Sequence, residues 1–151
     1  MDFDQFTILI ADDDEGHVIL VQDNLRGSGL KNPMLTFGDG QELMDFLHGV
    51  HPNHRFDATA SYLLLLDIRM PRMDGVETLR RIKGDPRLKK LPVIMLTTTD
   101  DPREVDRCHE LGCSCYLTKP VDYSQFAETI SRLGLFISLM KLPHIVEGAD
   151  G

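Results

Sequence analysis

The amino-acid sequence predicts an α/β fold in which helices cover both faces of a parallel, doubly wound sheet. Two observations lead to this fold class. Short apolar runs alternate with segments whose apolar residues recur every three or four positions, as strands alternate with helices. The apolar runs are nearly continuous, which is typical of strands buried on both faces. The pattern predicts five strands and five helices in a single sheet.

Three strands and two helices are predicted in the first half of the chain. The strands are short runs of apolar and β-branched residues, at 6–11, 33–37 and 62–67. The helices carry apolar side chains at helical spacing, with Val18, Val21 and Leu25 in the first and Leu43, Phe46 and Leu47 in the second, which lies within 38–49. Asp13 or Asp14 can cap the first helix. The polar segment 48–61 is predicted to be a solvated loop.

The second half of the chain predicts three helices and two strands. The helices lie at 75–86, 100–112 and 121–141, and the strands at 91–97 and 113–118. The second of these helices has the clearest ends, with Asp101 as its cap, Pro102 in its first turn and Gly112 just past its last turn.

The length and composition of the chain indicate its domain organisation and exclude some kinds of binding partner. The chain has 151 residues, which suits a single domain over 1–151, with its core at about 6–140 and a tail at 141–151. The 24 acidic residues outnumber the 16 basic ones, so nucleic acids and anionic membranes are not expected partners. The N-terminus lacks the pattern of a secretory signal, and an odd number of cysteines argues against a disulfide framework. We therefore expect a cytoplasmic protein.

Polar side chains follow four of the predicted strands. Asp12 and Asp13 follow the first, Asp67 the third and Lys119 the fifth, and Thr97 ends the fourth. These residues meet at one edge of the sheet, where such folds bind ligands. The carboxylates are hard ligands that suit Mg²⁺, and a lysine and a hydroxyl beside them suit a phosphoryl group. We therefore predict that Asp67 is a nucleophile that forms an acyl phosphate.

At these residues the chain resembles the receiver domain of two-component response regulators. The matching motifs are the acidic pair at 12–13, DIRMPRMDG at 67–75, MLTT at 95–98 and TKP at 118–120. The resemblance covers about residues 6–140. It implies a (βα)5 flavodoxin-like fold, with the five-stranded parallel sheet in the order 2-1-3-4-5.

The resemblance also implies a metal site for Mg²⁺ or Mn²⁺. Asp13 and Asp67 would coordinate the ion directly, and Asp12 would act through a water molecule. The backbone carbonyl of Arg69 would supply the remaining protein ligand.

The resemblance further assigns the reaction and its switch. Asp67 would be the phosphoacceptor, assisted by Thr97 and Lys119, and the Lys119–Pro120 peptide bond would be cis. On phosphorylation, Thr97 would move toward the phosphoryl group and Tyr116 would turn inward. The surface formed by the last two helices and the fifth strand would then change shape.

The implied protein is a single-domain regulator in a phosphorelay. A sensor histidine kinase would supply the phosphoryl group, and the receiver would catalyse its own phosphorylation and dephosphorylation without turning over external substrates. The long loop before the third strand and the ending LGLFISLMKLP resemble regulators paired with bacterial phytochrome kinases.

Two other functions fit parts of the sequence. A haloacid-dehalogenase-type phosphatase also uses an aspartate nucleophile with Mg²⁺, and Asp12-x-Asp14 follows the first strand as its motif requires. That class needs a further acidic pair after the lysine, which Asp122 alone does not supply. A receiver-like interaction module that is never phosphorylated is the other alternative, although such modules usually lose one of the site residues.

The last predicted helix carries more apolar residues than one buried face needs. Phe136, Leu139 and Met140 lie off the stripe that faces the core, which suggests a homodimer surface. The alternative is that the tail folds back and covers them with Leu142, Ile145 and Val146.

Two further groups of residues are expected to be structural. His48, His51 and His54 are spaced by three, but a glycine and a proline interrupt any helix that would align them as zinc ligands. Cys113 and Cys115 flank a predicted strand and are expected to be small core thiols rather than a metal or redox pair.

Overall fold

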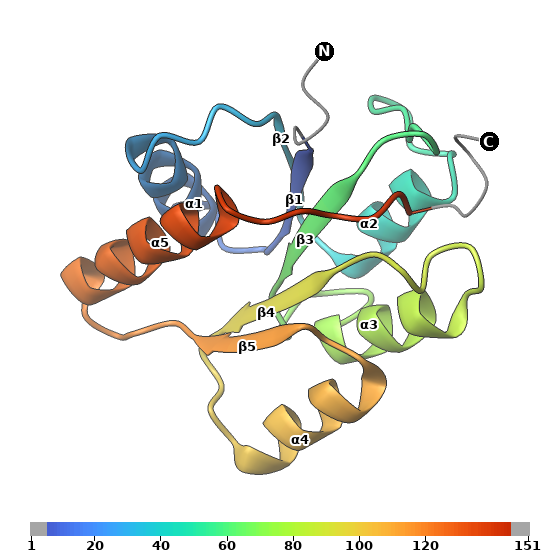
Figure 1. Ribbon diagram of the computed structural model, residues 1–151. Helices are drawn as coiled ribbons and strands as arrows, with labels where there is room; N and C mark the ends of the chain where they lie inside the picture. The colour runs from blue at the N-terminus through green and yellow to red at the C-terminus, as the bar shows by residue number, and fades with distance from the viewer. Residues whose placement is uncertain (1–5, 146–151) are drawn as a thin grey trace.

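The computed structural model describes residues 6–145, which form five strands and five helices in alternation (Figure 1). The strands are β1 (Thr7–Ala11), β2 (Met34–Phe37), β3 (Tyr62–Leu66), β4 (Val93–Thr97) and β5 (Cys115–Thr118). The helices are α1 (Glu15–Gly27), α2 (Gly40–Leu47), α3 (Gly75–Gly84), α4 (Pro102–Leu111) and α5 (Tyr123–Ile137). Within residues 6–145, every helix is too short or too polar to reach across a membrane.

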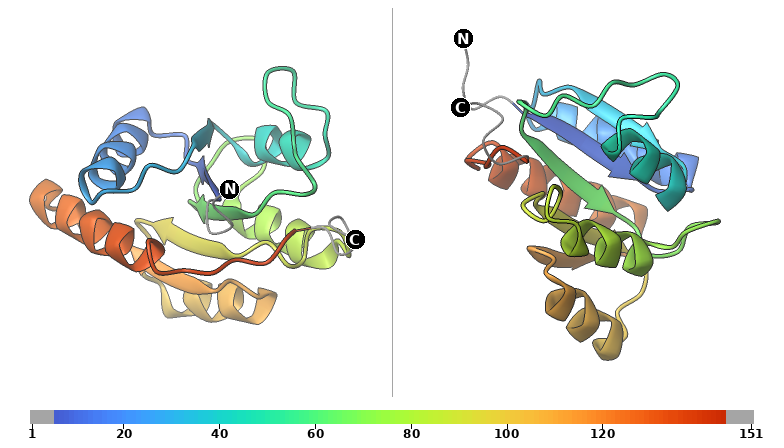
Figure 2. Two further views of the ribbon diagram at one scale, coloured as in Figure 1. Left: turned by 45° about the horizontal axis from the view of Figure 1, so that its top comes forward. Right: turned by 90° about the vertical axis from the view of Figure 1, so that its right-hand side faces the viewer.

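The strands form one parallel sheet in the order β2-β1-β3-β4-β5. Helices α1 and α5 cover one face of this sheet, and α2, α3 and α4 cover the other (Figures 1 and 2). The predicted fold class and strand order are therefore confirmed. In this arrangement the carboxyl ends of all five strands lie at one edge of the sheet.

The leucine run of β3 supplies both hydrophobic cores. Leu63 and Leu65 pack with α1 and α5, whereas Leu64 and Leu66 pack with the helices of the opposite face. This division follows from the pleat, because successive side chains of a strand point to opposite faces. Burying one leucine contributes roughly 2 kcal/mol. The run therefore fixes the position of Asp67, the residue that follows it.

Each of the five helices begins after an aspartate whose side chain accepts a backbone N–H of the first turn. These capping residues are Asp14, Asp39, Asp74, Asp101 and Asp122. The choice between Asp13 and Asp14 as the first cap is thereby decided, and Asp13 is left free of this role. At the other end of α4, Gly112 adopts a φ of 110°, a left-handed conformation that favours glycine.

Helix α5 is shorter than the sequence predicted, because it ends at Ile137 rather than near residue 141. The Ser138 hydroxyl donates a hydrogen bond to the Leu135 carbonyl, and the next backbone bonds span only three residues. The following segment folds back onto the molecule. There Leu142 packs against the α1–α5 core, and Ile145 is buried in the core of the opposite face. Val146 lies outside the described residues.

The loop at 48–61, the histidine loop, carries three histidines and is more closely packed than the sequence predicted. The His51 side chain is only 4% exposed, and its Nδ1 accepts the backbone N–H groups of Asn53 and His54. Its Nε2 lies 3.2 Å from Glu42 Oε1 on α2. The expectation of a fully solvated loop was therefore wrong at His51, which ties the loop to α2, although His48 is exposed.

Candidate functional site

The structure brings the polar residues that follow the strands to one edge of the sheet. Asp12 and Asp13 follow β1, Asp67 follows β3, Thr97 ends β4 and Lys119 follows β5. Asp12, Asp67, Thr97 and Lys119 are buried, and Asp13 is exposed. A buried set of charged groups is costly unless its members are paired, so their mutual contacts decide what the site can do.

The Lys119 ammonium lies at the centre of these contacts. Its Nζ atom is 2.6 Å from Asp12 Oδ2 and 3.1 Å from Asp67 Oδ2. It is also 3.0 Å from Nδ1 of His17, a residue of α1 that the sequence analysis did not identify. His17 lies in the first turn of α1, which begins just after the acidic pair, and this place next to the carboxyl end of β1 is the sequence signal that could have found it.

Three carboxylates converge beside this lysine. Asp12, Asp13 and Asp67 each place one oxygen within 4.8 Å of the others. Burial raises the pKa of Asp12, and this effect is partly offset by the hydrogen bond from Lys119. One ammonium cannot neutralise three carboxylates, and oxygen ligands suit a hard divalent cation. The residues present therefore fit Mg²⁺ or Mn²⁺.

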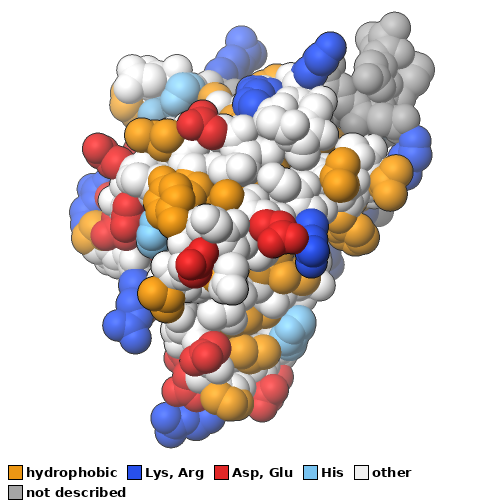
Figure 3. All heavy atoms as spheres, turned by 90° about the vertical axis from the view of Figure 1, so that its left-hand side faces the viewer, with side chains coloured by type: hydrophobic (Ala, Val, Ile, Leu, Met, Phe, Trp, Pro, Cys, Tyr) orange, Lys and Arg blue, Asp and Glu red, His pale blue; other side chains and the backbone are white. Residues whose placement is uncertain are grey.

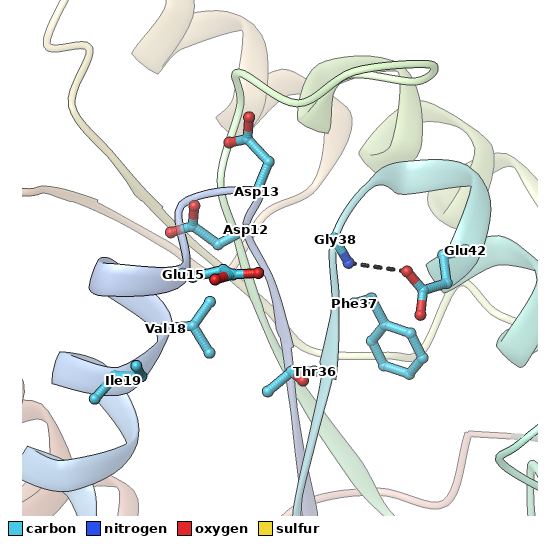
Figure 4. Close-up of a pocket in the computed structure, with 9 residues that line it drawn as sticks. All are labelled: Asp12, Asp13, Glu15, Val18, Ile19, Thr36, Phe37, Gly38 and Glu42. Carbon is cyan, nitrogen blue, oxygen red and sulfur yellow. Dashed lines mark hydrogen bonds between the residues drawn. The ribbon is translucent and has the colours of Figure 1, made fainter.

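A cavity of about 400 Å³ lies beside the carboxylates (Figure 4). Its walls come from α1 on one side and from β2 and α2 on the other, and Asp12 and Asp13 lie at its upper end in the view shown. On the far wall, Glu42 accepts the Gly38 N–H at 3.0 Å. This opening leaves room for the water molecules that a small cation such as Mg²⁺ retains.

Thr97 has a hydroxyl with no partner. Its side chain is fully buried, and within residues 6–145 its Oγ1 is the one buried side-chain oxygen or nitrogen without a hydrogen bond. The Thr97 backbone carbonyl accepts the Lys119 N–H at 2.6 Å, which joins the ends of β4 and β5. A buried unsatisfied hydroxyl costs about 1–3 kcal/mol. Because the Thr97 hydroxyl has no existing hydrogen bond to lose, it is free to bind an incoming oxygen atom.

The Asp67 side chain is held by its own loop. Its Oδ1 accepts the Ile68 N–H at 2.7 Å, and the Gly75 N–H reaches back to the Ile68 carbonyl at 2.7 Å. A Cβ atom at Gly75 would lie 2.0 Å from the Asp67 carbonyl oxygen. The glycine of the DIRMPRMDG motif is therefore required because the first turn of α3 packs directly against the backbone of Asp67.

The loop between β3 and α3 is also tied to α2. Arg72 adopts a φ of 64°, and its guanidinium contacts the Asp39 carboxylate at 2.8 Å. The Gly40 N–H donates to the Met73 carbonyl at 3.2 Å. Arg69 lies in this loop, two residues after Asp67, and is exposed. The loop that carries the Arg69 carbonyl is thus held at both ends.

Tyr116 on β5 is half-buried and contacts the opposite loop. Its hydroxyl donates a hydrogen bond to the Thr99 carbonyl at 2.7 Å, two residues after Thr97. Burial raises the pKa of Tyr116 to about 12, so the phenol stays protonated as a donor.

The expected cis peptide bond between Lys119 and Pro120 is a wrong prediction. Residues 6–145 contain no cis peptide bond. The trans form is the intrinsically preferred one even before proline. With this bond trans, Lys119 still reaches both Asp12 and Asp67.

The apolar residues that were predicted to lie on the last helix off its core stripe divide into two groups. Phe136 is 61% exposed and Leu139 is 79% exposed, as expected for residues off the core stripe. Met140 instead packs against the α1–α5 core, because the chain turns after Ile137. Leu135 takes its place among the exposed residues. The folded-back tail does not bury Phe136 or Leu139.

We expect the stability of Asp12→Asn relative to the wild type to rise with pH in the metal-free protein. The raised pKa of Asp12 means that its ionised form is less favourable in the folded than in the unfolded chain. The stability contributed by protonated Asp12 is therefore lost as the pH rises through that raised pKa. Urea denaturation of both proteins in EDTA between about pH 4 and pH 7 measures the difference in unfolding free energy. A difference that stays constant with pH would contradict this assignment.

Known proteins that are similar to this chain in sequence and fold are response regulators. The chain is 37% identical over 114 residues to response regulator Rcp1 of Synechocystis sp., which covers 74% of this chain and 75% of that protein. The Mn²⁺-bound structure of Rcp1 superposes with a TM-score of 0.82 at 31% identity, covering 91% of this chain and 99% of Rcp1.

Two further solved structures share the fold over nearly their whole length. A response regulator receiver domain from Rhodospirillum rubrum has a TM-score of 0.86 at 41% identity, covering 93% of this chain and 99% of that one. The phosphorylated cyanobacterial phytochrome response regulator RcpA has a TM-score of 0.80 at 31% identity, with 92% and 99% covered. The family model for the response regulator receiver domain matches residues 8–131. The chain belongs to this family and is a signalling protein related to the phytochrome response regulators.

Proposed function

We propose that this receiver accepts a phosphoryl group on Asp67 from the phosphohistidine of a sensor histidine kinase. One observation carries the proposal. The buried Lys119 ammonium contacts Asp67, and the adjacent strand ends at Thr97, whose buried hydroxyl lacks a partner. An ammonium in contact with the carboxylate, and an unpartnered hydroxyl at the end of the neighbouring strand, form a site that suits phosphoryl oxygens.

In the proposed reaction, an Asp67 carboxylate oxygen attacks phosphorus as the nitrogen–phosphorus bond of phosphohistidine breaks. The kinase histidine leaves with the bonding electron pair, and Asp67 becomes an acyl phosphate. Lys119 neutralises charge on the phosphoryl oxygens, and the Thr97 hydroxyl donates a hydrogen bond to one of them. Attack of water on phosphorus later restores the Asp67 carboxylate and releases inorganic phosphate.

We assign the metal site to Asp13 and Asp67, with Asp12 acting through water and Arg69 supplying its backbone carbonyl. A bound Mg²⁺ or Mn²⁺ would neutralise negative charge on the phosphoryl oxygens. Lys119 itself holds the acceptor carboxylate, since its Nζ atom lies 3.1 Å from Asp67 Oδ2 and 2.6 Å from Asp12 Oδ2.

We propose that phosphorylation is transmitted through Thr97 and Tyr116. Movement of Thr97 toward the phosphoryl group would shift the loop whose Thr99 carbonyl accepts the Tyr116 hydroxyl. Tyr116 would then turn into the space that Thr97 leaves, and the surface of α4, β5 and α5 would change. Structures of the two states with Tyr116 in a single rotamer would contradict this switch.

We propose a bacteriophytochrome as the kinase, because the relatives include a phytochrome response regulator. Three apolar residues are exposed around α1 and the start of α5: Ile19 lies on α1, Tyr123 begins α5 and Val121 lies just before that helix. Figure 3 shows the side of the molecule at which β4 and β5 end, and on it apolar side chains lie among acidic ones. We propose that the kinase docks there, and that the cytoplasm is the site of the encounter.

We propose a homodimer through Leu135, Phe136 and Leu139. The double variant Phe136→Glu, Leu139→Glu is expected to shift the protein from dimer to monomer, because exposed apolar side chains gain most from burial against a second copy. Light scattering at tens of micromolar protein measures the mass. Val50→Glu, at a residue 68% exposed in the histidine loop, is the control and should stay dimeric. A monomeric wild type would contradict the proposal.

Intact-mass measurement tests the proposed phosphorylation. The wild-type protein is incubated with acetyl phosphate, with Mg²⁺ in one sample and EDTA in another. We expect one phosphoryl group per chain, formed only with Mg²⁺. An unchanged mass in both samples would favour a receiver-like module that is not phosphorylated.

A further inference from the structure

His17 is the third partner of the site lysine. An ammonium group has three N–H donors, and those of Lys119 face Asp12 Oδ2, Asp67 Oδ2 and His17 Nδ1 at 2.6, 3.1 and 3.0 Å. Lys119 is 3% exposed, so water has little access to compete for these positions. Each donor of the buried ammonium therefore has an acceptor.

The contacts of His17 indicate which ring nitrogen accepts a hydrogen bond. An ammonium can only donate, so Nδ1 must accept and must carry no proton. The ring proton is then on Nε2, which faces Asp14 Oδ2 at 3.5 Å. The backbone N–H of His17 donates to Asp14 Oδ1 at 3.1 Å, so the cap of α1 also places the ring beside Asp14. A carboxylate that faces Nε2 favours the tautomer with its proton there, which leaves Nδ1 as the acceptor for Lys119.

The ring is also held from α5. Its centroid lies 5.4 Å from that of the buried Phe126 in an edge-to-face arrangement. Helices α1 and α5 lie side by side on one face of the sheet (Figures 1 and 2). His17 is therefore fixed by its own helix cap and by the neighbouring helix, and its Nδ1 is a rigid acceptor.

A neutral acceptor such as His17 Nδ1 can hold the Lys119 ammonium without neutralising its charge, whereas a carboxylate would neutralise it. Asp12 and Asp67 pair with the ammonium by charge, and phosphorylation converts the Asp67 carboxylate into an uncharged acyl oxygen. The contact with His17 does not depend on that charge. We propose that His17 is a positioning residue that holds the Lys119 ammonium in place during phosphoryl transfer while leaving its positive charge available to the phosphoryl group. This inference rests on the proposed phosphorylation of Asp67.

Three variants distinguish the effect of the Nδ1 acceptor of His17 from the effect of its ring packing. His17→Phe keeps a ring against Phe126 but removes the acceptor, and His17→Asn keeps an acceptor atom at the δ1 position. His48→Phe, at an exposed histidine of the α2 end, is the matched control. The rate of phosphorylation by acetyl phosphate with saturating Mg²⁺ is followed by intact mass. We expect His17→Phe to be about tenfold slower, as for loss of roughly 1.4 kcal/mol. His17→Asn should lie within about threefold of the wild type, and His48→Phe should equal it.

A second measurement reports on the lysine itself. In ¹³C-labelled protein, the ε-methylene signal of Lys119, assigned by its loss in Lys119→Met, should shift in His17→Phe and return toward its wild-type position in His17→Asn. Equal rates and equal Lys119 signals in His17→Phe and the wild type would overturn the inference alone. A rate loss in His17→Asn as large as in His17→Phe would also overturn it, because packing would then be the cause. Absence of any adduct on the wild type would overturn the proposed function and the inference with it.

Discussion

Asp67→Asn is expected to abolish the phosphoryl adduct completely. The amide cannot act as the nucleophile, although its oxygen can still accept the Ile68 N–H that Asp67 Oδ1 accepts at 2.7 Å. The variant should therefore fold like the wild type and fail only in the reaction. Intact mass after incubation with acetyl phosphate and Mg²⁺ measures the loss, and the thermal unfolding midpoint checks the fold.

The same variant separates the receiver from the phosphatase alternative. A haloacid-dehalogenase-type enzyme would use Asp12 with Asp14, so it would keep its nucleophile in Asp67→Asn. In the structure, Asp14 caps α1 and faces His17, and the carboxylates that meet Asp12 are Asp13 and Asp67. An adduct that persists in Asp67→Asn would show that another carboxylate is the acceptor.

Gly75→Ala is expected to destabilise the protein strongly without changing any charged group. The added Cβ would lie 2.0 Å from the Asp67 carbonyl oxygen and 2.8 Å from the Ile68 Cα. Both contacts are to backbone, so relief requires moving α3 or the strand end. We expect destabilisation of about 3 kcal/mol, at the upper end for overpacking, and a reduced rate of phosphorylation because Asp67 is displaced.

Gly84→Ala is the control for this prediction. Gly84 ends the same helix, and a Cβ there meets no atom within 4 Å. Alanine should stabilise the protein by up to about 1 kcal/mol through its helix propensity. Urea denaturation of both variants in EDTA gives the two free energies. Similar values for Gly75→Ala and Gly84→Ala would show that the close approach at Asp67 is not tight in solution.

Most of the fold could be predicted because its elements are locally consistent. The run YLLLLD could only be a buried strand that ends at a charge, and the structure divides its leucines between two cores. The end of α5 could not be predicted in the same way. There the residues 136–141 favour a helix by pattern, but Ser138 competes for a backbone carbonyl and Ile145 is buried against the far face.

Only those site residues whose positions follow from where the strands end could be predicted from the sequence. Asp12, Asp67 and Lys119 are brought together because parallel strands end at one edge, and this needs no knowledge of side-chain packing. His17 was missed because its role depends on the rotamer that Phe126 and Asp14 impose. The burial of His51 was missed because it depends on contacts across the chain with Glu42.

The measurement that tests the central claim most directly is the location of the phosphoryl group. Wild-type protein phosphorylated by acetyl phosphate is treated with borohydride, which reduces an acyl phosphate to the alcohol, and is then mapped by peptide mass spectrometry. We predict homoserine in place of aspartate at position 67 and unmodified aspartates at 12 and 13. Reduction at Asp12 or Asp13, with Asp67 unchanged, would contradict the assignment of the phosphoacceptor.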